Sequence, residues 1–76
     1  MERIRFSLNL SADEFLYYYR GQAQAVSVVA QDGRRVQIPA SSLRRFVERN
    51  GVTGQFEMVL GENHKLLRIE RISREA

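Results

Sequence analysis

The chain has no cysteine, and it has only one histidine and one lysine among its 76 residues. Without cysteine it can form neither a disulfide framework nor a thiolate metal site. Because His64 stands alone, no second histidine is present to complete a metal site either. We therefore expect the protein to carry no metal ion.

Long apolar runs are also absent from the sequence. No stretch approaches the roughly 20 apolar residues that span a bilayer, and the first five residues, MERIR, lack the apolar core of a secretory signal. We therefore expect a cytoplasmic protein that has no membrane partner.

The short length of the chain limits its architecture. Seventy-six residues fall below the roughly 100 to 200 residues of a typical domain, and so short a chain leaves little room for a deep active-site cleft. Its 43% hydrophobic and 28% charged residues are typical of a globular protein and not of a disordered one. We expect a single domain over residues 1–76, in which residues 73–76 form a frayed tail.

The first part of the chain predicts a strand followed by a helix. Residues 3–10 alternate strictly between apolar and polar side chains, which is typical of a half-buried strand. Ser11 and Glu14 fit a capping box, in which each side chain accepts a hydrogen bond from the backbone N–H of the other residue. We expect a short helix through residues 15–19, and Gly21 is placed to end it in a left-handed conformation.

The next segment predicts a hairpin. Residues 22–30 and 34–38 read as strands, and the Asp32-Gly33 pair between them is a strong hairpin signal because its turn needs positive φ angles. Pro39 is expected to end the second of these strands.

A second helix is predicted to begin near Ser41 or Ser42. The apolar residues that then repeat at helical spacing are Leu43, Phe46 and Val47. Asn50-Gly51 is placed to end this helix.

Two more strands are predicted over residues 52–60 and 66–72, joined by a polar loop. The order is therefore strand, helix, two strands, helix, two strands. We expect an α+β fold with a mainly antiparallel five-stranded sheet, which can curl into a partly open barrel. The expected core residues are Ile4, Phe6, Leu8, Phe15, Val26, Val28, Val36, Ile38, Leu43, Phe46, Val47, Phe56, Met58, Leu67 and Ile69.

Four groups of residues carry a resemblance to a known family. They are residues 18–21 (YYRG), residues 32–40 (DGRRVQIPA), Leu43-Arg44 with Phe46-Val47, and residues 51–56 (GVTGQF). Together they resemble a family of short bacterial proteins known only as a domain of unknown function, family 2835. The resemblance spans nearly the whole chain and implies a bacterial, stand-alone, single-domain protein. It implies no activity, cofactor or catalytic residue.

Side chains suited to catalysis are sparse. His64 lies in a predicted turn, where a solvated residue is far more common than a catalytic base with its partners in place. Glu14 and Asp32 are accounted for by the helix cap and the hairpin turn. The sequence has no Gly-rich phosphate loop ending in Lys-Ser or Lys-Thr and no dinucleotide-binding fingerprint. We therefore expect no enzymatic activity and no cofactor.

Positive charge is carried almost entirely by arginine, which supplies eleven of the twelve Lys and Arg residues and leaves a net charge of +3. The planar guanidinium group matches phosphate and carboxylate, although a GC-rich genome would produce the same bias. The candidate nucleic-acid or anion-binding residues are Arg20, Arg34, Arg35, Arg44, Arg45 and Arg49, with Tyr17 and Tyr18 as stacking rings. The competing interpretation is that these side chains form ordinary solvated faces, while Tyr19 joins Phe15 in the core.

From these features we predict a small non-enzymatic binding module whose partner is nucleic acid or another polyanion, such as an acidic protein. The net charge of +3 weighs against nucleic acid unless the positive groups gather on one face. The alternative is a protein-interaction or self-associating adaptor module with no nucleic-acid role. Such a module would use an exposed strand edge or the tyrosine-rich helix, and a homodimer is compatible with it.

Overall fold

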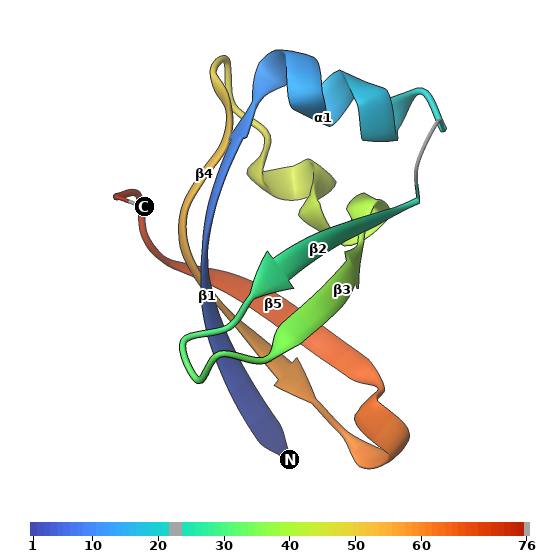
Figure 1. Cartoon of the computed structure of the whole chain (residues 1–76), viewed down its shortest axis with the longest axis vertical. Coiled ribbons are helices and arrows are strands. Elements are labelled where there is room, and N and C mark those ends of the chain that lie inside the picture. Colours follow the sequence, from blue (N-terminus) through green and yellow to red (C-terminus); the bar gives the residue numbers. More distant parts are fainter. Residues whose placement is uncertain (22–23, 76) are drawn as a thin grey trace.

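Five strands and one α-helix form the framework of the protein. The computed structural model describes residues 1–21 and 24–75, so residues 22 and 23, where the second predicted strand begins, lie outside the described residues. In chain order the elements are β1 (Glu2–Ser11), α1 (Ala12–Tyr19), β2 (Ala25–Val29), β3 (Arg35–Pro39), the 3₁₀ helix η1 (Ala40–Phe46), β4 (Gly51–Leu60), the short 3₁₀ helix η2 (Glu62–His64) and β5 (Leu66–Ser73) (Figure 1). The α+β class and the antiparallel pairing predicted from the sequence are confirmed.

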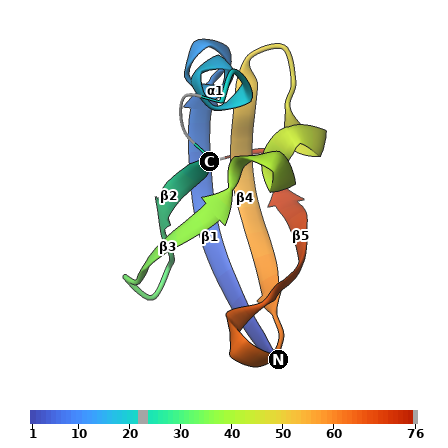
Figure 2. The same cartoon turned by 90° about the vertical axis from the view of Figure 1, so that its right-hand side faces the viewer.

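The strands form two sheets where the sequence predicted one sheet of five strands. A three-stranded sheet has the order β1-β4-β5, and β2 and β3 form a separate two-stranded ribbon. The ribbon meets β1 at a bridge between Phe6 and Ala30, and the backbone N–H of Gln31 donates to the carbonyl oxygen of Arg5 at 2.8 Å. Instead of extending the sheet edge to edge, the ribbon crosses its inner face (Figures 1 and 2). This arrangement buries the apolar faces of both sheets against each other, and the sheets do not close into a barrel.

One apolar core lies between the two sheets, α1 and η1. Its buried members are Ile4, Phe6, Leu8, Leu10, Phe15, Val26, Val28, Ala30, Ile38, Ala40, Leu43, Val52, Phe56, Met58, Leu60 and Ile69. The rings of Phe6 and Phe56 are stacked with centroids 5.6 Å apart, and the ring of Phe46 meets Phe56 edge-on at 5.1 Å. Strict alternation along β1 predicted its inward face correctly, but the list of expected core residues omitted five members of the buried cluster: Leu10, Ala30, Ala40, Val52 and Leu60.

The predicted start and end of α1 are confirmed. The backbone N–H of Glu14 donates to the Ser11 hydroxyl at 3.1 Å, and the backbone N–H of Ser11 donates to the Glu14 carboxylate at 3.0 Å. Leu10 and Phe15, which flank the cap, are both buried, so the strand-to-helix corner is held by packing as well as by hydrogen bonds. Gly21 follows the helix with φ +80°, a left-handed conformation that glycine adopts without strain.

The second helix differs from its prediction because it is a 3₁₀ helix and not an α-helix. A 3₁₀ helix repeats every three residues, so Ala40, Leu43 and Phe46 share its inner face. Val47 lies past the helix in extended backbone, and 39% of its surface is exposed, so its predicted place in the core was wrong. The helix does not end at Asn50-Gly51, because Glu48 and Gly51 instead exchange two backbone hydrogen bonds, of 2.8 and 2.9 Å, in a tight turn into β4.

Strand β5 contains two register shifts, and one of them explains why the core prediction for Leu67 was wrong. Leu60 pairs with Leu66 while Val59 pairs with Arg68, so Leu67 is an extra residue in a β-bulge. Half of its surface is exposed, and its predicted place in the core was therefore wrong. Val36 and Phe46, also predicted to be core residues, are half-buried and pack against the buried cluster.

The capping box leads to a prediction about stability. Ser11→Ala should lower the free energy of unfolding by about 0.5 to 2 kcal/mol, because the N–H of Glu14 loses its acceptor. The cap lowers the pKa of Glu14, chiefly because the backbone N–H of Ser11 donates to its carboxylate. The stabilisation that this carboxylate contributes is therefore present above the usual carboxylate pKa and is lost as pH falls through the lowered value. Urea unfolding at neutral and acid pH measures both effects, and an Ser11→Ala variant as stable as the parent would contradict the role of the cap.

Candidate functional site

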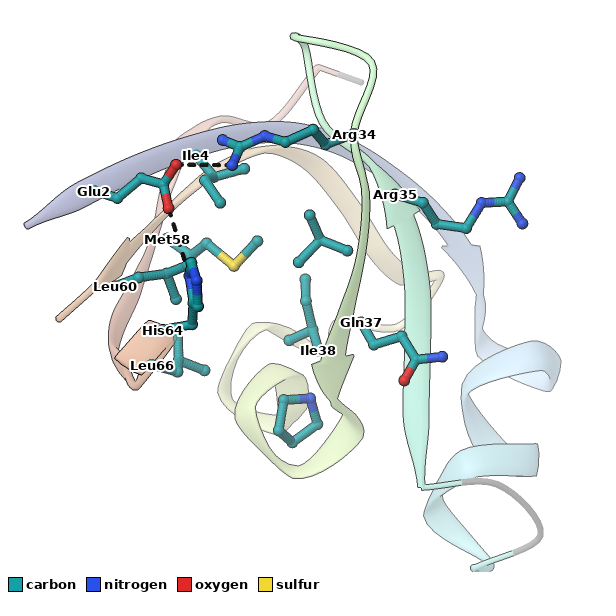
Figure 3. A pocket seen from close by; sticks show the side chains of 12 residues that line it. Glu2, Ile4, Arg34, Arg35, Gln37, Ile38, Met58, Leu60, His64 and Leu66 are labelled. Carbon is teal, nitrogen blue, oxygen red and sulfur yellow. Dashed lines mark hydrogen bonds and ion pairs between the residues drawn. The ribbon is translucent and has the colours of Figure 1, made fainter. Parts of the chain in front are cut away.

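The structure separates the predicted cationic residues into several places. Arg34 lies at the tip of the β2–β3 hairpin, where its guanidinium group contacts Glu2 at 2.8 Å and Asp32 at 2.6 Å. The hydrogen bond to Glu2 contributes most to a raised pKa for Arg34. The pKa of Asp32 is lowered, chiefly because its carboxylate accepts the backbone N–H of Arg34. The charge of Arg34 is thus compensated within the protein, and the adjacent Arg35 points away from Glu2 (Figure 3).

Arg20 and Arg49 lie apart from this hairpin tip. Arg20 is the residue after α1, where its backbone N–H donates to the carbonyl oxygen of Leu16 at 2.9 Å. Arg49 lies in the turn that leads into β4. Both residues are exposed, and because Arg20 follows α1 and Arg49 precedes β4, neither belongs to the hairpin tip.

Helix η1 carries the other two predicted arginines, Arg44 and Arg45. The guanidinium group of Arg45 donates to the carbonyl oxygen of Ile69 and lies over the ring of Phe46, 4.5 Å from its centroid. Ile69 belongs to β5, which is an edge strand. The hydrogen bond from Arg45 therefore links η1 to the edge of the three-stranded sheet. This arginine therefore has a structural role in addition to its charge.

Tyr18 and Arg44 line one cavity of about 330 Å³ at the junction of α1 and η1, together with Gln24 and Ser41. The neighbouring ring of Tyr17 lies edge-on to Tyr18, with centroids 6.0 Å apart and an interplanar angle of 84°. The rings therefore do not form a flat stacking platform, although Tyr17 is 52% exposed. The side chain of Tyr19, the third ring, lies outside the described part of the structure.

A second cavity, of about 450 Å³, adjoins the first on the other side of η1. It is lined by Ser41 and Arg44, which both cavities share, and by Arg45 and Arg68. The two cavities are therefore neighbours that share two lining residues. We call this surface the η1 strip, and its residues are Tyr18, Gln24, Ser41, Arg44, Arg45 and Arg68.

Six of the arginines form ion pairs with carboxylates among the described residues. Arginines that pair with carboxylates are Arg3 and Arg5 with Glu57, Arg34 with Glu2 and Asp32, Arg68 with Glu70, and Arg71 and Arg74 with Glu48. By contrast, Arg20, Arg35, Arg45 and Arg49 form no ion pair with a carboxylate in residues 1–21 and 24–75. Helix η1 itself contains no acidic residue. Glu48 lies beyond the helix, and its pKa is lowered chiefly by the hydrogen bond from Arg74.

Sequence reasoning missed Arg71, the most enclosed of the paired arginines. Only 15% of its side chain is exposed, and its guanidinium group lies over the rings of both Phe46 and Phe56, 5.7 and 5.4 Å from their centroids. It also donates to the carbonyl oxygen of Phe46 at 3.2 Å and pairs with Glu48 at 3.0 Å. The signal was present in the sequence, because Arg71 falls two residues after the inward-facing Ile69.

A third cavity, of about 500 Å³, lies between β3 and the lower half of the three-stranded sheet (Figure 3). Its floor is apolar and is formed by Ile4, Ile38, Met58, Leu60 and Leu66. We call this cavity the β3 groove.

The polar rim of the β3 groove contains the lone histidine. Nδ1 of His64 lies 3.9 Å from the carboxylate of Glu2, which also holds Arg34. His64 is a solvated loop residue whose side chain is 83% exposed. Among the described residues, His, Asp and Glu side chains form no cluster of three that could hold a metal ion. Likewise, no described helix is both long enough and apolar enough to cross a membrane.

Comparison with known proteins identifies a family and no closer relative. The family model described as "Protein of unknown function (DUF2835)" matches residues 2–72. No curated protein and no solved structure matches the chain.

Proposed function

The chain belongs to the DUF2835 family of proteins of unknown function, and we propose that it is a small non-enzymatic module that binds a polyanion on the η1 strip. Single-stranded nucleic acid is the ligand that best suits the residues present. The observation that carries the proposal is that Tyr18 of α1 and Arg44 of η1 line one cavity, and that η1 contains no acidic residue.

The chemistry of the strip suits a phosphate backbone with bases beside it. A guanidinium group offers a planar pair of donors to phosphate, and Arg44 is the cation that both cavities share. The Ser41 hydroxyl and the Gln24 amide add neutral hydrogen-bonding groups to the same cavity. The ring of Tyr18 supplies an aromatic surface for a base, a contact that depends little on base identity. Binding of this kind is weakly sequence-specific.

The compensation of charge elsewhere also supports the η1 strip. The acidic residues on the outer face of the three-stranded sheet are paired there, as in the contacts of Arg3 and Arg5 with Glu57 at 3.4 and 3.0 Å. On that face Glu57 offsets one of the two positive charges of Arg3 and Arg5, whereas η1 carries two arginines, Arg44 and Arg45, and no acidic residue. The small net charge of +3 is therefore compatible with a local polyanion site.

A charge-matched pair of variants tests this function. Arg44→Ala should weaken binding of single-stranded RNA about tenfold or more, because a hydrogen bond to a charged group contributes ~1.5 to 3 kcal/mol. It should also reduce the slope of log K against log salt by about 0.7, which is one phosphate contact to a single strand. Arg5→Ala removes the same charge from the outer face of the sheet and should leave both values nearly unchanged. The measurement is fluorescence anisotropy with labelled single-stranded RNA, single-stranded DNA and duplex DNA at low salt, on variants whose melting temperatures are checked first.

Failure of this experiment would favour the alternative class of function. No binding to any of the three nucleic acids at tens of micromolar protein would contradict the polyanion proposal, since even non-specific binding commonly reaches a Kd of ~10⁻⁴ to 10⁻⁶ M. Equal losses in Arg44→Ala and Arg5→Ala would contradict the placement on η1. In the first case a protein-interaction module without a nucleic-acid role becomes the better account.

A further inference from the structure

Strand β3 has an outer edge that no described strand pairs with. Hydrogen bonds at both ends of the ribbon fix which backbone groups face β2. The N–H of Ala30 donates to the carbonyl oxygen of Arg34 at 2.8 Å, and the N–H of Ala40 donates to that of Gln24 at 2.9 Å. Because bonding residues alternate along an antiparallel pair, the N–H and C=O groups of Arg35 and Gln37 point away from β2.

The outward groups of β3 border the β3 groove (Figure 3). The groove lies between this edge and the apolar side chains of Met58, Leu60 and Leu66, which come from β4 and β5. A strand placed there would hydrogen-bond to β3 and set alternate side chains on the apolar floor. Both elements of strand addition, a free edge and pockets for alternate residues, are thus adjacent.

Two other sheet edges each accept a hydrogen bond of a kind that the outward groups of β3 lack among the described residues. The carbonyl oxygen of Ile69 on β5 accepts from Arg45, and the carbonyl oxygen of Arg5 on β1 accepts from the N–H of Gln31. Covering of this kind prevents strands from other chains from adding to an edge. No such contact to the outward groups of Arg35 and Gln37 occurs among the described residues.

We propose that the β3 groove binds an uncharged, extended segment of a partner protein, about five residues long, which adds to β3 as an antiparallel strand. A volume of about 500 Å³ is typical of a cavity that encloses most of a small ligand. Antiparallel addition repeats the pairing of the existing strands and is the slightly more stable arrangement. This inference is independent of the η1 strip, whose residues do not line the groove.

The charges of the rim indicate that the segment is uncharged. Glu2 is already shared by Arg34 at 2.8 Å and His64 at 3.9 Å, and Arg34 also holds Asp32 at 2.6 Å. Because these rim charges already pair with one another, a charged segment would gain no new ion pair from them. It would also lose hydration on the apolar floor. Arg35, which has no such partner in the described residues, points away from the groove.

The ends of β3 argue against a second copy of this chain as the occupant. Two β3 strands paired antiparallel about Gln37 would place Arg35 of each copy opposite Pro39 of the other. Proline has no N–H to donate, and prolines and charged residues discourage pairing between sheet edges. A short segment that hydrogen-bonds only to the backbone N–H and C=O groups of Arg35 and Gln37 needs no N–H from Pro39 and brings no second Arg35 to the edge.

The test uses a blocked peptide of about seven residues in which valine alternates with serine, titrated into ¹⁵N-labelled protein. In the proposed register the serine amides face β3 and the valine side chains face the floor. The amide signals of Arg35 and Gln37 should shift and their hydrogen exchange should slow, while the signal of Arg44 stays in place. N-methylation of the serines should weaken binding about tenfold or more, whereas N-methylation of the valines should not, since each net hydrogen bond contributes ~0.5 to 1.5 kcal/mol.

A pair of variants provides a second test on the protein itself. Gln37→Pro removes an outward donor and leaves the pairing with β2 intact, because edge positions tolerate proline. Gln37→Pro should weaken peptide binding about as much as N-methylation of the serines does. Gln37→Ala keeps the backbone N–H and should bind the peptide as the parent protein does. Amide signals that stay unchanged up to about 1 mM peptide would overturn the proposal. They would mean a Kd weaker than ~1 mM, which corresponds to a binding free energy of less than ~4 kcal/mol. Shifts at Arg35 and Gln37 that depend on protein concentration without peptide would also overturn it, because they would show a second copy at the edge.

Discussion

Replacing Gly51, a buried residue at the start of β4, with alanine should strongly destabilise the protein. Gly51 has φ +110°, and a Cβ built there would lie 2.0 Å from the carbonyl oxygen of Leu10 and 2.7 Å from the backbone nitrogen of Ala12. The obstructing atoms are backbone atoms of the β1–α1 corner, so they cannot move without disturbing the capping box. A left-handed conformation costs ~1 to 2 kcal/mol in a residue with a Cβ, and overpacking costs ~1 to 3 kcal/mol more.

The summed loss of about 2 to 5 kcal/mol is large for a chain of this size, whose total stability should be about 4 to 11 kcal/mol at ~0.05 to 0.15 kcal/mol per residue. Gly33→Ala is the matched control, because Gly33 has φ +91° but nothing within 4 Å of its Cβ position. The control should show the conformational cost alone. Thermal melts of both variants make the comparison, and equal losses would contradict the close approach at Gly51.

Phe56→Ala should have the second large effect on stability. Phe56 is fully buried, stacks on Phe6 at 5.6 Å and meets Phe46 at 5.1 Å. The guanidinium group of Arg71 also lies 5.4 Å from its ring. Truncation removes these contacts and leaves a cavity, which should cost about 3 to 5 kcal/mol. Urea unfolding of the variant measures this cost.

Leu67→Ala is the control for the aromatic core, because the sequence predicted Leu67 to be buried and the structure exposes it in a bulge. Its expected cost lies near the ~0.5 kcal/mol of a surface substitution. A large cost for Leu67→Ala together with a small one for Phe56→Ala would show that the pairing of β4 with β5 is wrong. The opposite order would support the register shifts described above.

Local features of the fold could be predicted because they depend on neighbouring residues. The capping box of Ser11 and Glu14 and the left-handed Gly21 involve groups a few residues apart, and all were identified correctly. The Asp32-Gly33 turn and the alternation along β1 belong to the same class. In each case the deciding interactions lie within the element itself.

Features that depend on distant contacts could not be predicted in the same way. Leu43, Phe46 and Val47 fit an α-helical repeat, and tertiary packing selected the three-residue repeat of Ala40, Leu43 and Phe46 instead. The exposure of Leu67 depends on a bulge that exists only when β5 pairs with β4. Whether the β2–β3 ribbon extends the sheet or crosses it depends on how the two apolar faces cover each other.

The candidate site was predicted in part. Tyr18 and Arg44 were chosen for residue type, and the structure places both at one cavity. Arg34 was chosen for the same reason, but Glu2, which is 32 residues away in sequence, compensates its charge. Gln24, Ser41 and Arg68 were missed because nothing in their local sequence marks them. Which carboxylate pairs with a given surface arginine depends on contacts that form only in the folded chain.

The measurement that tests the central claim most directly is a map of the nucleic-acid contact on ¹⁵N-labelled protein. Unlabelled single-stranded RNA is added at low salt, and backbone signals are followed across the whole chain. The account predicts that signals of Tyr18, Ser41 and Arg44 shift, while those of Arg5 and Glu57 on the outer face stay in place. Shifts concentrated on the outer face, or none anywhere on the protein, would contradict the assignment of the η1 strip as a polyanion site.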